Sequence, residues 1–165
     1  MSKHFLNSLR RKHQLAGCVT SRMQKKGCKL PDPPANSLII DMDEAGAPVS
    51  QRAQRCDYLL FAILVVKKHG ALLFCPVEMK QTISTKAIKQ LQAGTIIGEK
   101  LLADCQEPIE FLPTCVYRQS AHSDILRDFR TRKVAFRHCG KKINRYVQEI
   151  KSGNSLSQVL AKELA

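Results

Sequence analysis

A nearly uninterrupted apolar stretch near the middle of the chain limits the folds that are open to it. It runs from Arg55 to Val66 (RCDYLLFAILVV), and Asp57 is the acidic residue within it. Its longest apolar part, Tyr58 to Val66, is far shorter than the roughly 20 residues that a membrane-spanning helix needs. A short run of this composition predicts a strand that is covered on both faces. We therefore expect a soluble protein with this strand inside its sheet.

A second apolar segment follows after a short polar turn. Lys67 to Gly70 supplies the turn, and Ala71 to Lys80 (ALLFCPVEMK) is the next predicted strand, so the two strands form an antiparallel hairpin. Pro76 has no backbone N–H to donate, and we expect it to lie at a bulge. The hairpin brings the start of the first strand beside the end of the second.

Polar side chains gather at this end of the hairpin. Asp57 is costly to bury unless it is paired or binds a metal. Glu78 and Lys80 are two residues apart on a strand, so they point to the same face. Two converging carboxylates repel each other, and a divalent cation such as Mg²⁺ or Mn²⁺ relieves that repulsion. The pattern predicts a metal site at Asp57 and Glu78, with Lys80 placed to orient the attacking water.

The rest of the chain shows helical, extended and turn-like patterns. Apolar residues from Thr85 to Ala103 recur at helical spacing, and Gly94 and Gly98 would allow this helix to pack closely on a sheet. The proline-rich stretch from Lys29 to Ser37 predicts a connector. The other expected elements are a helix over 3–16, a strand over 38–43, a loop over 44–54, a strand over 109–117, a short helix or turn over 123–130, a basic hairpin over 133–150 and a closing helix over 155–164.

The polar residues of the hairpin and the helix that follows resemble the PD-(D/E)xK nuclease superfamily over roughly residues 37–118. The resemblance implies an α/β fold with a mixed central sheet that contains an antiparallel strand hairpin and is flanked by helices, known as the restriction-endonuclease-like core. It also implies metal-dependent hydrolysis of phosphodiester bonds. Asp57 and Glu78 would bind Mg²⁺ or Mn²⁺, and Lys80 would lie beside the attacking water. The matching segments are Cys56-Asp57-Tyr58-Leu59-Leu60, Val77-Glu78-Met79-Lys80 and Ala87-Ile88-Lys89-Gln90-Leu91-Gln92-Ala93-Gly94.

The resemblance also implies two further site residues, a glutamine and an additional acidic residue. A glutamine on the helix after the hairpin assists in some branches, and Gln90 is the first candidate here, with Gln92 second. Many members carry an acidic residue on a helix before the first strand, whereas residues 1–30 of this chain contain none. Asp41, Asp43 or Glu44 could take its place, which leaves a second metal position open.

The charge of the chain favours a polyanionic partner. Lys and Arg total 27 against 14 Asp and Glu, which gives a formal net charge of +13. Basic clusters bind phosphate backbones by releasing counterions, so we expect a nucleic acid as the partner. DNA is the first candidate and RNA the second, although the charge does not distinguish them. Solubility and attraction to an anionic membrane surface are the alternatives, but nothing else in the composition marks a membrane protein. The expected nucleic-acid contacts are Arg10, Arg11, Lys12, Lys25, Lys26, Arg130, Arg132 and Lys133.

The cysteines indicate a reducing compartment, because the 7 of them are irregularly spaced and several lie inside apolar segments. The N-terminus lacks an apolar stretch of secretory length, so we expect a cytoplasmic protein. A zinc site that combines Cys18 and Cys28 with His138 and Cys139 would need unusual spacing. The cysteines expected to be buried thiols are Cys56, Cys75, Cys105 and Cys115.

We expect a single domain over residues 1–165, with a basic N-terminal extension (1–36), a nuclease-like core (37–118) and a basic C-terminal hairpin and helix (119–165). A second Glu-x-Lys triplet, Glu149-Ile150-Lys151, follows a polar segment and is expected to be solvated surface. The alternative to a nuclease is a catalytically inactive protein of the same fold that binds nucleic acid or a protein partner. A zinc-stabilised interaction module is a third hypothesis, and a homodimer is compatible with all of them.

Overall fold

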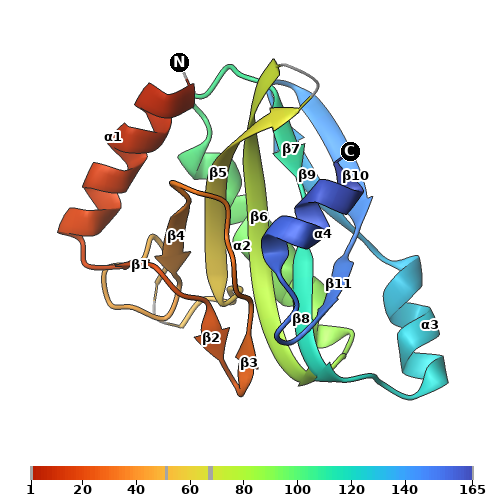
Figure 1. Ribbon diagram of the computed structural model, residues 1–165. Helices are drawn as coiled ribbons and strands as arrows, with labels where there is room; N and C mark the ends of the chain where they lie inside the picture. Colours follow the sequence, from red (N-terminus) through yellow and green to blue (C-terminus); the bar gives the residue numbers. More distant parts are fainter. Residues whose placement is uncertain (1, 51, 67–68, 165) are drawn as a thin grey trace.

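A mixed seven-stranded sheet forms the centre of the computed structural model, which describes residues 2–50, 52–66 and 69–164 (Figure 1). Its strands are β1 (Val19–Thr20), β4 (Leu38–Asp41), β5 (Tyr58–Val66), β6 (His69–Thr82), β7 (Ile109–Phe111), β8 (Thr114–Gln119) and β11 (Gln148–Lys151). They lie in the order β1-β4-β5-β6-β8-β11, and β7 also pairs with β6. β4, β5 and β6 are antiparallel neighbours, whereas β7 and β8 run parallel to β6. The predicted α/β class with a mixed sheet is confirmed.

The predicted apolar hairpin is confirmed as the pair β5 and β6. Its register is continuous over the whole of β5, so the bulge that we expected at Pro76 is not present in this pair. Pro76 instead lies where β6 exchanges one parallel neighbour, β7, for the next, β8, so its missing N–H does not interrupt either ladder. The strand predicted over 109–117 is divided at Leu112 and Pro113 into these two neighbours. The turn residues Lys67 and Lys68 fall outside the described residues.

Helices cover both faces of the sheet (Figure 1). α2 (Lys86–Leu101) and α1 (Ser2–Leu15) pack on one face, where Leu91 is among the residues buried against the phenylalanines of β5 and β6. α4 (Leu156–Glu163) packs on the other face, where Leu156 is fully buried. This arrangement follows from the apolar sequence of β5, which has to be covered on both sides.

Glycines let α2 approach the sheet closely, as the sequence predicted. A Cβ atom at Gly94 would lie 2.2 Å from the Cys56 Sγ atom, and a Cβ atom at Gly98 would lie 2.0 Å from the Phe74 ring. No real side chain fits at such distances, so glycine is required at both positions. The helix is thereby held against the segment that leads into β5.

The C-terminal part contains α3 (Ser123–Thr131) and a hairpin of β9 (Lys133–His138) and β10 (Lys141–Tyr146). The predicted basic hairpin is therefore shorter than expected, because residues 148–151 leave it and form β11 beside β8. For the same reason, the prediction that the triplet Glu149-Ile150-Lys151 is solvated surface is wrong at Ile150, whereas Lys151 is exposed and Glu149 is partly exposed in an ion pair with Arg130. Ile150 is 2% exposed and joins the core on the α4 side of the sheet.

The β9–β10 hairpin is fixed to α2 and to the aromatic core. The side-chain amide of Gln92 donates to the carbonyl oxygen of Ala135 at 2.9 Å and accepts from its N–H at 2.8 Å. Phe136 stacks on Phe111 with ring centroids 4.8 Å apart. These contacts attach β9 to the helix that follows the central hairpin.

A short N-terminal hairpin, which the sequence did not predict, precedes the proline-rich connector. Its strands are β2 (Gln24–Lys25) and β3 (Cys28–Lys29), and its turn residues Lys26 and Gly27 have φ angles of 54° and 74°. Glycine tolerates this left-handed conformation readily, whereas lysine adopts it rarely. Cys28 is buried in the core on the α4 side, which anchors the hairpin to the sheet.

Candidate active site

The register of β5 and β6 places Asp57 and Glu78 side by side. Tyr58 pairs with Val77, so Asp57, which directly precedes β5, lies opposite Glu78. The Asp57 Oδ2 atom accepts a hydrogen bond of 2.8 Å from the backbone N–H of Met79. Asp57 is 4% exposed, and Glu78 is 0% exposed. The structure thus brings together the two carboxylates that the sequence singled out.

Lys80 joins this pair from the same strand. Because side chains two residues apart on a strand point to one face, its ammonium lies close to Glu78. The Lys80 Nζ atom is 3.4 Å from the Glu78 Oε2 atom, and the Lys80 side chain is 16% exposed. Lys80 therefore connects a fully buried carboxylate to the surface of the protein.

Burial makes ionisation of Glu78 unfavourable. Loss of solvent raises the pKa of this carboxyl, the nearby charge of Asp57 raises it further, and Lys26 and Lys80 lower it. The balance leaves the pKa of Glu78 at about 7, above its ordinary value of 4.5. The Glu78 Oε1 atom is buried and has no hydrogen-bond partner among the described residues. A further cation beside Glu78 would therefore stabilise its ionised form.

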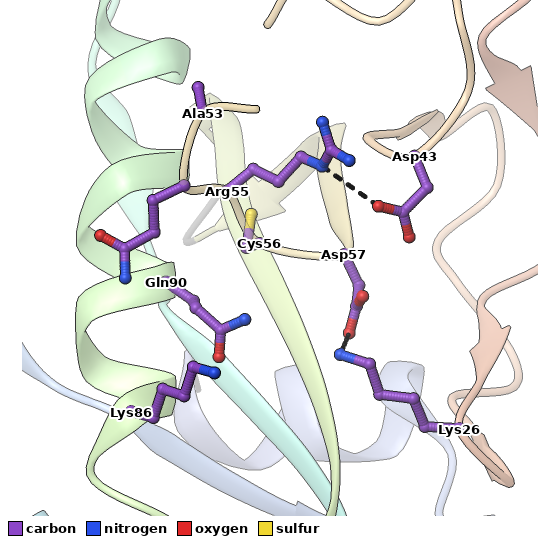
Figure 2. Close-up of a pocket in the computed structure, with 9 residues that line it drawn as sticks. Lys26, Asp43, Ala53, Arg55, Cys56, Asp57, Lys86 and Gln90 are labelled. Atoms are coloured by element: carbon purple, nitrogen blue, oxygen red, sulfur yellow. Dashed lines mark hydrogen bonds and ion pairs between the residues drawn. The ribbon is translucent and has the colours of Figure 1, made fainter. Parts of the chain in front are cut away.

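An ammonium group from the N-terminal hairpin lies between the two carboxylates. The Lys26 Nζ atom is 3.1 Å from Asp57 Oδ2 and 3.4 Å from Glu78 Oε2, and Figure 2 shows the contact with Asp57. Burial lowers the pKa of Lys26, but Glu78 and Asp57 outweigh this effect, so the pKa is raised overall. Lys26, which the sequence suggested as a nucleic-acid contact, thus lies at the carboxylate pair.

A second group of charges lies next to this one. The Lys25 ammonium contacts both Asp41 and Asp43, and the Arg55 Nε atom is 3.1 Å from Asp43 Oδ1 (Figure 2). Burial raises the pKa of Asp43, but the hydrogen bond from Lys25 and the charges of Lys25 and Arg55 outweigh it, so the pKa lies below its ordinary value. Of the acids considered for a second metal position, Asp41 and Asp43 are held by cations of this chain, and Glu44 is exposed.

A pocket with a volume of ≈ 280 Å³ opens beside Asp57, between the start of β5 and α2. Figure 2 shows Gln90 and Lys86 projecting from α2 toward the centre of this pocket. The Gln90 Oε1 atom is buried without a hydrogen-bond partner among the described residues. Gln92 is occupied by its contacts with β9, so Gln90 is the predicted glutamine that lies at the pocket. The lining residues are Lys26, Asp43, Ala53, Gln54, Arg55, Cys56, Asp57, Lys86 and Gln90.

The carboxylate pair matches the preference of a small divalent cation for oxygen ligands. Asp57 and Glu78 can offer oxygens from adjacent strands, and Glu78 has one oxygen without a partner among the described residues. Among the residues that the structure describes, no group of three or more His, Cys, Asp or Glu side chains could hold a metal ion. Mg²⁺ needs no such group, because it commonly takes one or two carboxylates and completes its shell with water and substrate phosphate.

The predicted nucleic-acid contacts of α1 lie at the β1–β4 side of the sheet (Figure 1). The Arg10 guanidinium donates hydrogen bonds to the backbone carbonyl oxygens of Asn36 and Ser37, at 2.6 and 3.1 Å. Arg11 and Lys12 are exposed. Arg10 therefore ties α1 to the connector before β4, and its two neighbours face solvent.

The remaining predicted contacts lie at the opposite side, around α3 and β9 (Figure 1). Arg130 donates two hydrogen bonds to Glu149, at 2.8 and 2.9 Å, and Arg132 pairs with Asp128 at 3.1 Å. Lys133 lies over a tyrosine ring of β10 at 4.7 Å. The basic residues of α1 and those around α3 and β9 therefore lie at opposite sides of the sheet (Figure 1).

Two of the cysteines lie next to the candidate site, because Cys56 lines the pocket and the Cys28 thiol donates to the carbonyl oxygen of Lys80. All of the cysteines are free thiols, and those expected to be buried are buried, whereas Cys139 is exposed. Cys18 and Cys28 belong to cores on opposite faces of the sheet, which separates two of the residues considered for a zinc site. In the described part of the chain, no helix is long and apolar enough to cross a membrane.

Comparison with protein-family models, with curated proteins and with solved structures found no match. The residue of the candidate site that the sequence did not predict is Lys26, whose ammonium contacts both carboxylates. The sequence did contain a signal for its position, since Lys26 and Gly27 form a turn between two short polar segments. That signal predicts a turn, but it does not predict that the turn lies beside Asp57 and Glu78.

Proposed function

We propose that this protein is a metal-dependent nuclease that hydrolyses phosphodiester bonds of nucleic acid, with DNA preferred over RNA. The observation that carries the proposal is the buried pair of Asp57 and Glu78 with Lys80 on the same face of β6. Burying two carboxylates side by side is costly, and a divalent cation between them would remove much of that cost. Mg²⁺ or Mn²⁺ is the expected ion.

The order of the elements supports a restriction-endonuclease-like core. After α1 and the two-residue strands β1, β2 and β3 come three antiparallel strands, β4, β5 and β6. Helix α2 follows, and then β7 and β8, which both run parallel to β6. A mixed sheet of this kind, with helices on both faces, is what the resemblance to the PD-(D/E)xK superfamily implies. The carboxylates lie where β5 begins, beside the last part of β6, within reach of α2.

The proposed chemistry assigns a separate task to each side chain. A cation held by Asp57 and Glu78 would neutralise charge on the phosphate and make a water molecule easier to deprotonate. The Lys80 ammonium would orient that water and offset the negative charge that develops during attack. Gln90 faces the pocket with an oxygen that has no partner among the described residues, and it would accept a hydrogen bond from the water or the substrate.

A second candidate function is binding without catalysis, and the position of Lys26 favours it. Its ammonium already contacts both carboxylates, so the pair is partly neutralised by the chain itself. A protein of this kind would keep the fold and its basic surfaces and bind nucleic acid or a protein partner. The two functions differ in whether the protein cleaves nucleic acid when Mg²⁺ or Mn²⁺ is present.

The decisive experiment is incubation of the protein with supercoiled plasmid, linear duplex, single-stranded DNA and RNA, each with Mg²⁺, Mn²⁺ or EDTA. We expect cleavage that depends on metal and falls by about 10² or more in Glu78→Ala and Lys80→Ala, because each removes a group that acts on the reacting phosphate and water. Both variants should retain nucleic-acid binding in a filter or gel-shift assay.

The second triplet provides the matched control. Glu149→Ala and Lys151→Ala change the same residue types on β11, which β8 separates from β6, and should cut at a rate close to that of the parent. Absence of cleavage by the parent on all substrates would favour the binding function. Cleavage that survives Glu78→Ala but disappears in Glu149→Ala would move the chemistry to the triplet on β11 and contradict the proposed site.

A further inference from the structure

The turn of the β2–β3 hairpin supplies a cation that contacts both carboxylates, whereas Lys80 contacts Glu78. The Lys26 ammonium touches Asp57 Oδ2 and Glu78 Oε2 at 3.1 and 3.4 Å, while its side chain remains 42% exposed. The ammonium therefore approaches from the solvent side of a buried pair. It occupies the side of the carboxylates from which an ion in solution would arrive.

The hairpin is held in place by contacts on several sides. The Gln81 Nε2 atom donates to the carbonyl oxygen of Lys26 at 3.1 Å, and the Cys28 thiol donates to the carbonyl oxygen of Lys80 at 3.3 Å. The backbone N–H of Lys29 donates to Ser152 Oγ at 2.9 Å. Lys25, the residue before the turn, is bound to two aspartates, one at the end of β4 and one just after it. These contacts position the Lys26 ammonium beside Asp57 and Glu78.

The Lys26 ammonium and a divalent ion would compete for this carboxylate pair, because both are cations that bind its oxygens. A carboxylate-bound Mg²⁺ or Mn²⁺ lies about 2.1 Å from its ligand oxygens. An ammonium that kept hydrogen bonds to the same oxygens would then be only a few ångströms from the ion, where like charges repel strongly. Lysine can leave this position without unfolding the hairpin, because its four-carbon stem is flexible and its side chain is partly exposed.

We propose that Lys26 fills the metal position in the free protein, so that metal loading requires this side chain to move away. The inference rests on the proposed function, because it assumes that Asp57 and Glu78 bind the ion. Lys26 then lowers the affinity for metal by competing for the carboxylates, and its side chain acts as a gate on the site while the β2–β3 hairpin stays in place. The affinity for metal is set by the free energy of the Lys26 contacts as well as by the carboxylates.

Calorimetric titration with Mn²⁺ tests this competition directly, without any measurement of cleavage. Lys26→Met removes the ammonium and keeps a side chain of similar length. Lys29→Met is the matched control, because it removes a lysine from an exposed position of the same hairpin and changes the net charge equally. We expect Lys26→Met to bind Mn²⁺ with a Kd about tenfold lower than the parent, which corresponds to about 1.4 kcal/mol. Lys29→Met should bind as the parent does.

A second variant covers the case in which Lys26→Met does not fold. Gln81→Ala removes the hydrogen bond to the Lys26 backbone but leaves every charge in place, and Gln81 is exposed. We expect its Kd for Mn²⁺ to fall about threefold, because a looser turn holds the ammonium less firmly, if that contact is worth about 0.7 kcal/mol as neutral hydrogen bonds commonly are.

The outcomes separate this inference from the proposed function. Equal Mn²⁺ affinity in the parent, Lys26→Met and Gln81→Ala would overturn the gate and leave the metal site intact. Weaker binding by Lys26→Met would also overturn it, because Lys26 would then assist the ion. Failure of all three proteins to bind Mn²⁺ would remove the metal site, and both proposals would fall together.

Discussion

The substitution Glu78→Gln should stabilise the metal-free protein at neutral and alkaline pH. Glutamine has nearly the same shape as glutamate but carries no charge, so the variant removes a buried anion while keeping the packing. The amide group of glutamine can donate to the neighbouring Asp57 carboxylate, which lies on the adjacent strand. Glu78→Gln therefore isolates the free energy of ionising this carboxyl inside the protein.

The size of the effect follows from the pKa. The pKa of Glu78 is about 7 in the folded protein and is taken as 4.5 in the unfolded chain. This difference means that ionising the carboxyl costs about 3 kcal/mol more in the folded protein than in the unfolded chain. A raised pKa means that the folded protein binds the proton more tightly than the unfolded chain does. Its stabilising contribution is therefore full below pH 4.5, declines as pH rises through about 7, and is absent above that. We expect a gain of about 1–3 kcal/mol at alkaline pH, because the structure relaxes around the charge.

Urea unfolding followed by circular dichroism, in EDTA and at several values between about pH 5 and about pH 8.5, measures this gain. The difference between Glu78→Gln and the parent should grow with pH and level off above about 7. The buried His13, whose pKa is lowered by burial and by Lys12, is present in both proteins, so its contribution cancels in the difference. Glu149→Gln, at a surface ion pair, should change stability by less than about 1 kcal/mol. A difference that stays flat with pH, or a variant that becomes less stable as pH rises, would refute the reasoning.

The other predictions concern packing and charge. Gly94→Ala should reduce the free energy of unfolding by about 1–3 kcal/mol, because its Cβ atom would overlap the Cys56 sulfur, whereas Gly70→Ala, with no atom within 4 Å of its Cβ position, should change it by less than about 0.5 kcal/mol. Affinity for duplex DNA, measured by fluorescence anisotropy, should fall steeply between about 50 and about 200 mM salt, because phosphate binding releases counterions. The combined charge reversal Lys141→Glu and Lys142→Glu, at exposed positions of β10, should weaken binding and reduce the salt slope by about 1 for each phosphate that the hairpin no longer neutralises. An unchanged slope would exclude the β9–β10 hairpin as a nucleic-acid-binding surface.

Local patterns were sufficient for the elements that create the candidate site. The apolar sequence of β5 and β6 predicts their pairing, and the period of two along a strand places Glu78 and Lys80 on one face. Helical spacing predicts α2, and Gly94 correctly indicated its close approach to the sheet. These inferences use only the order of residues along the chain and the register of a simple antiparallel hairpin. They could therefore be made from the sequence.

Contacts between distant segments were not predictable in this way. Lys26 meets Glu78 across 52 positions of sequence, and nothing in the residues around Lys26 indicates which strand end its turn will reach. β11 was missed for a similar reason, because Ile150 supplies its buried position and the pairing with β8 is decided by the sheet already formed. Pro76 was misjudged because its place in the sheet depends on where two other strands meet.

The attachment of β9 to α2 has a geometric consequence. The amide of Gln92 holds the backbone of Ala135, and Gln90, slightly earlier on the same helix, faces the pocket beside Asp57. One helix thus connects the pocket to the base of the basic hairpin (Figure 1). If the hairpin binds a nucleic acid while the pocket cleaves it, the helix fixes the distance between the bound segment and the cleaved bond. The products would then end at a constant number of nucleotides from the bound segment, whatever their sequence.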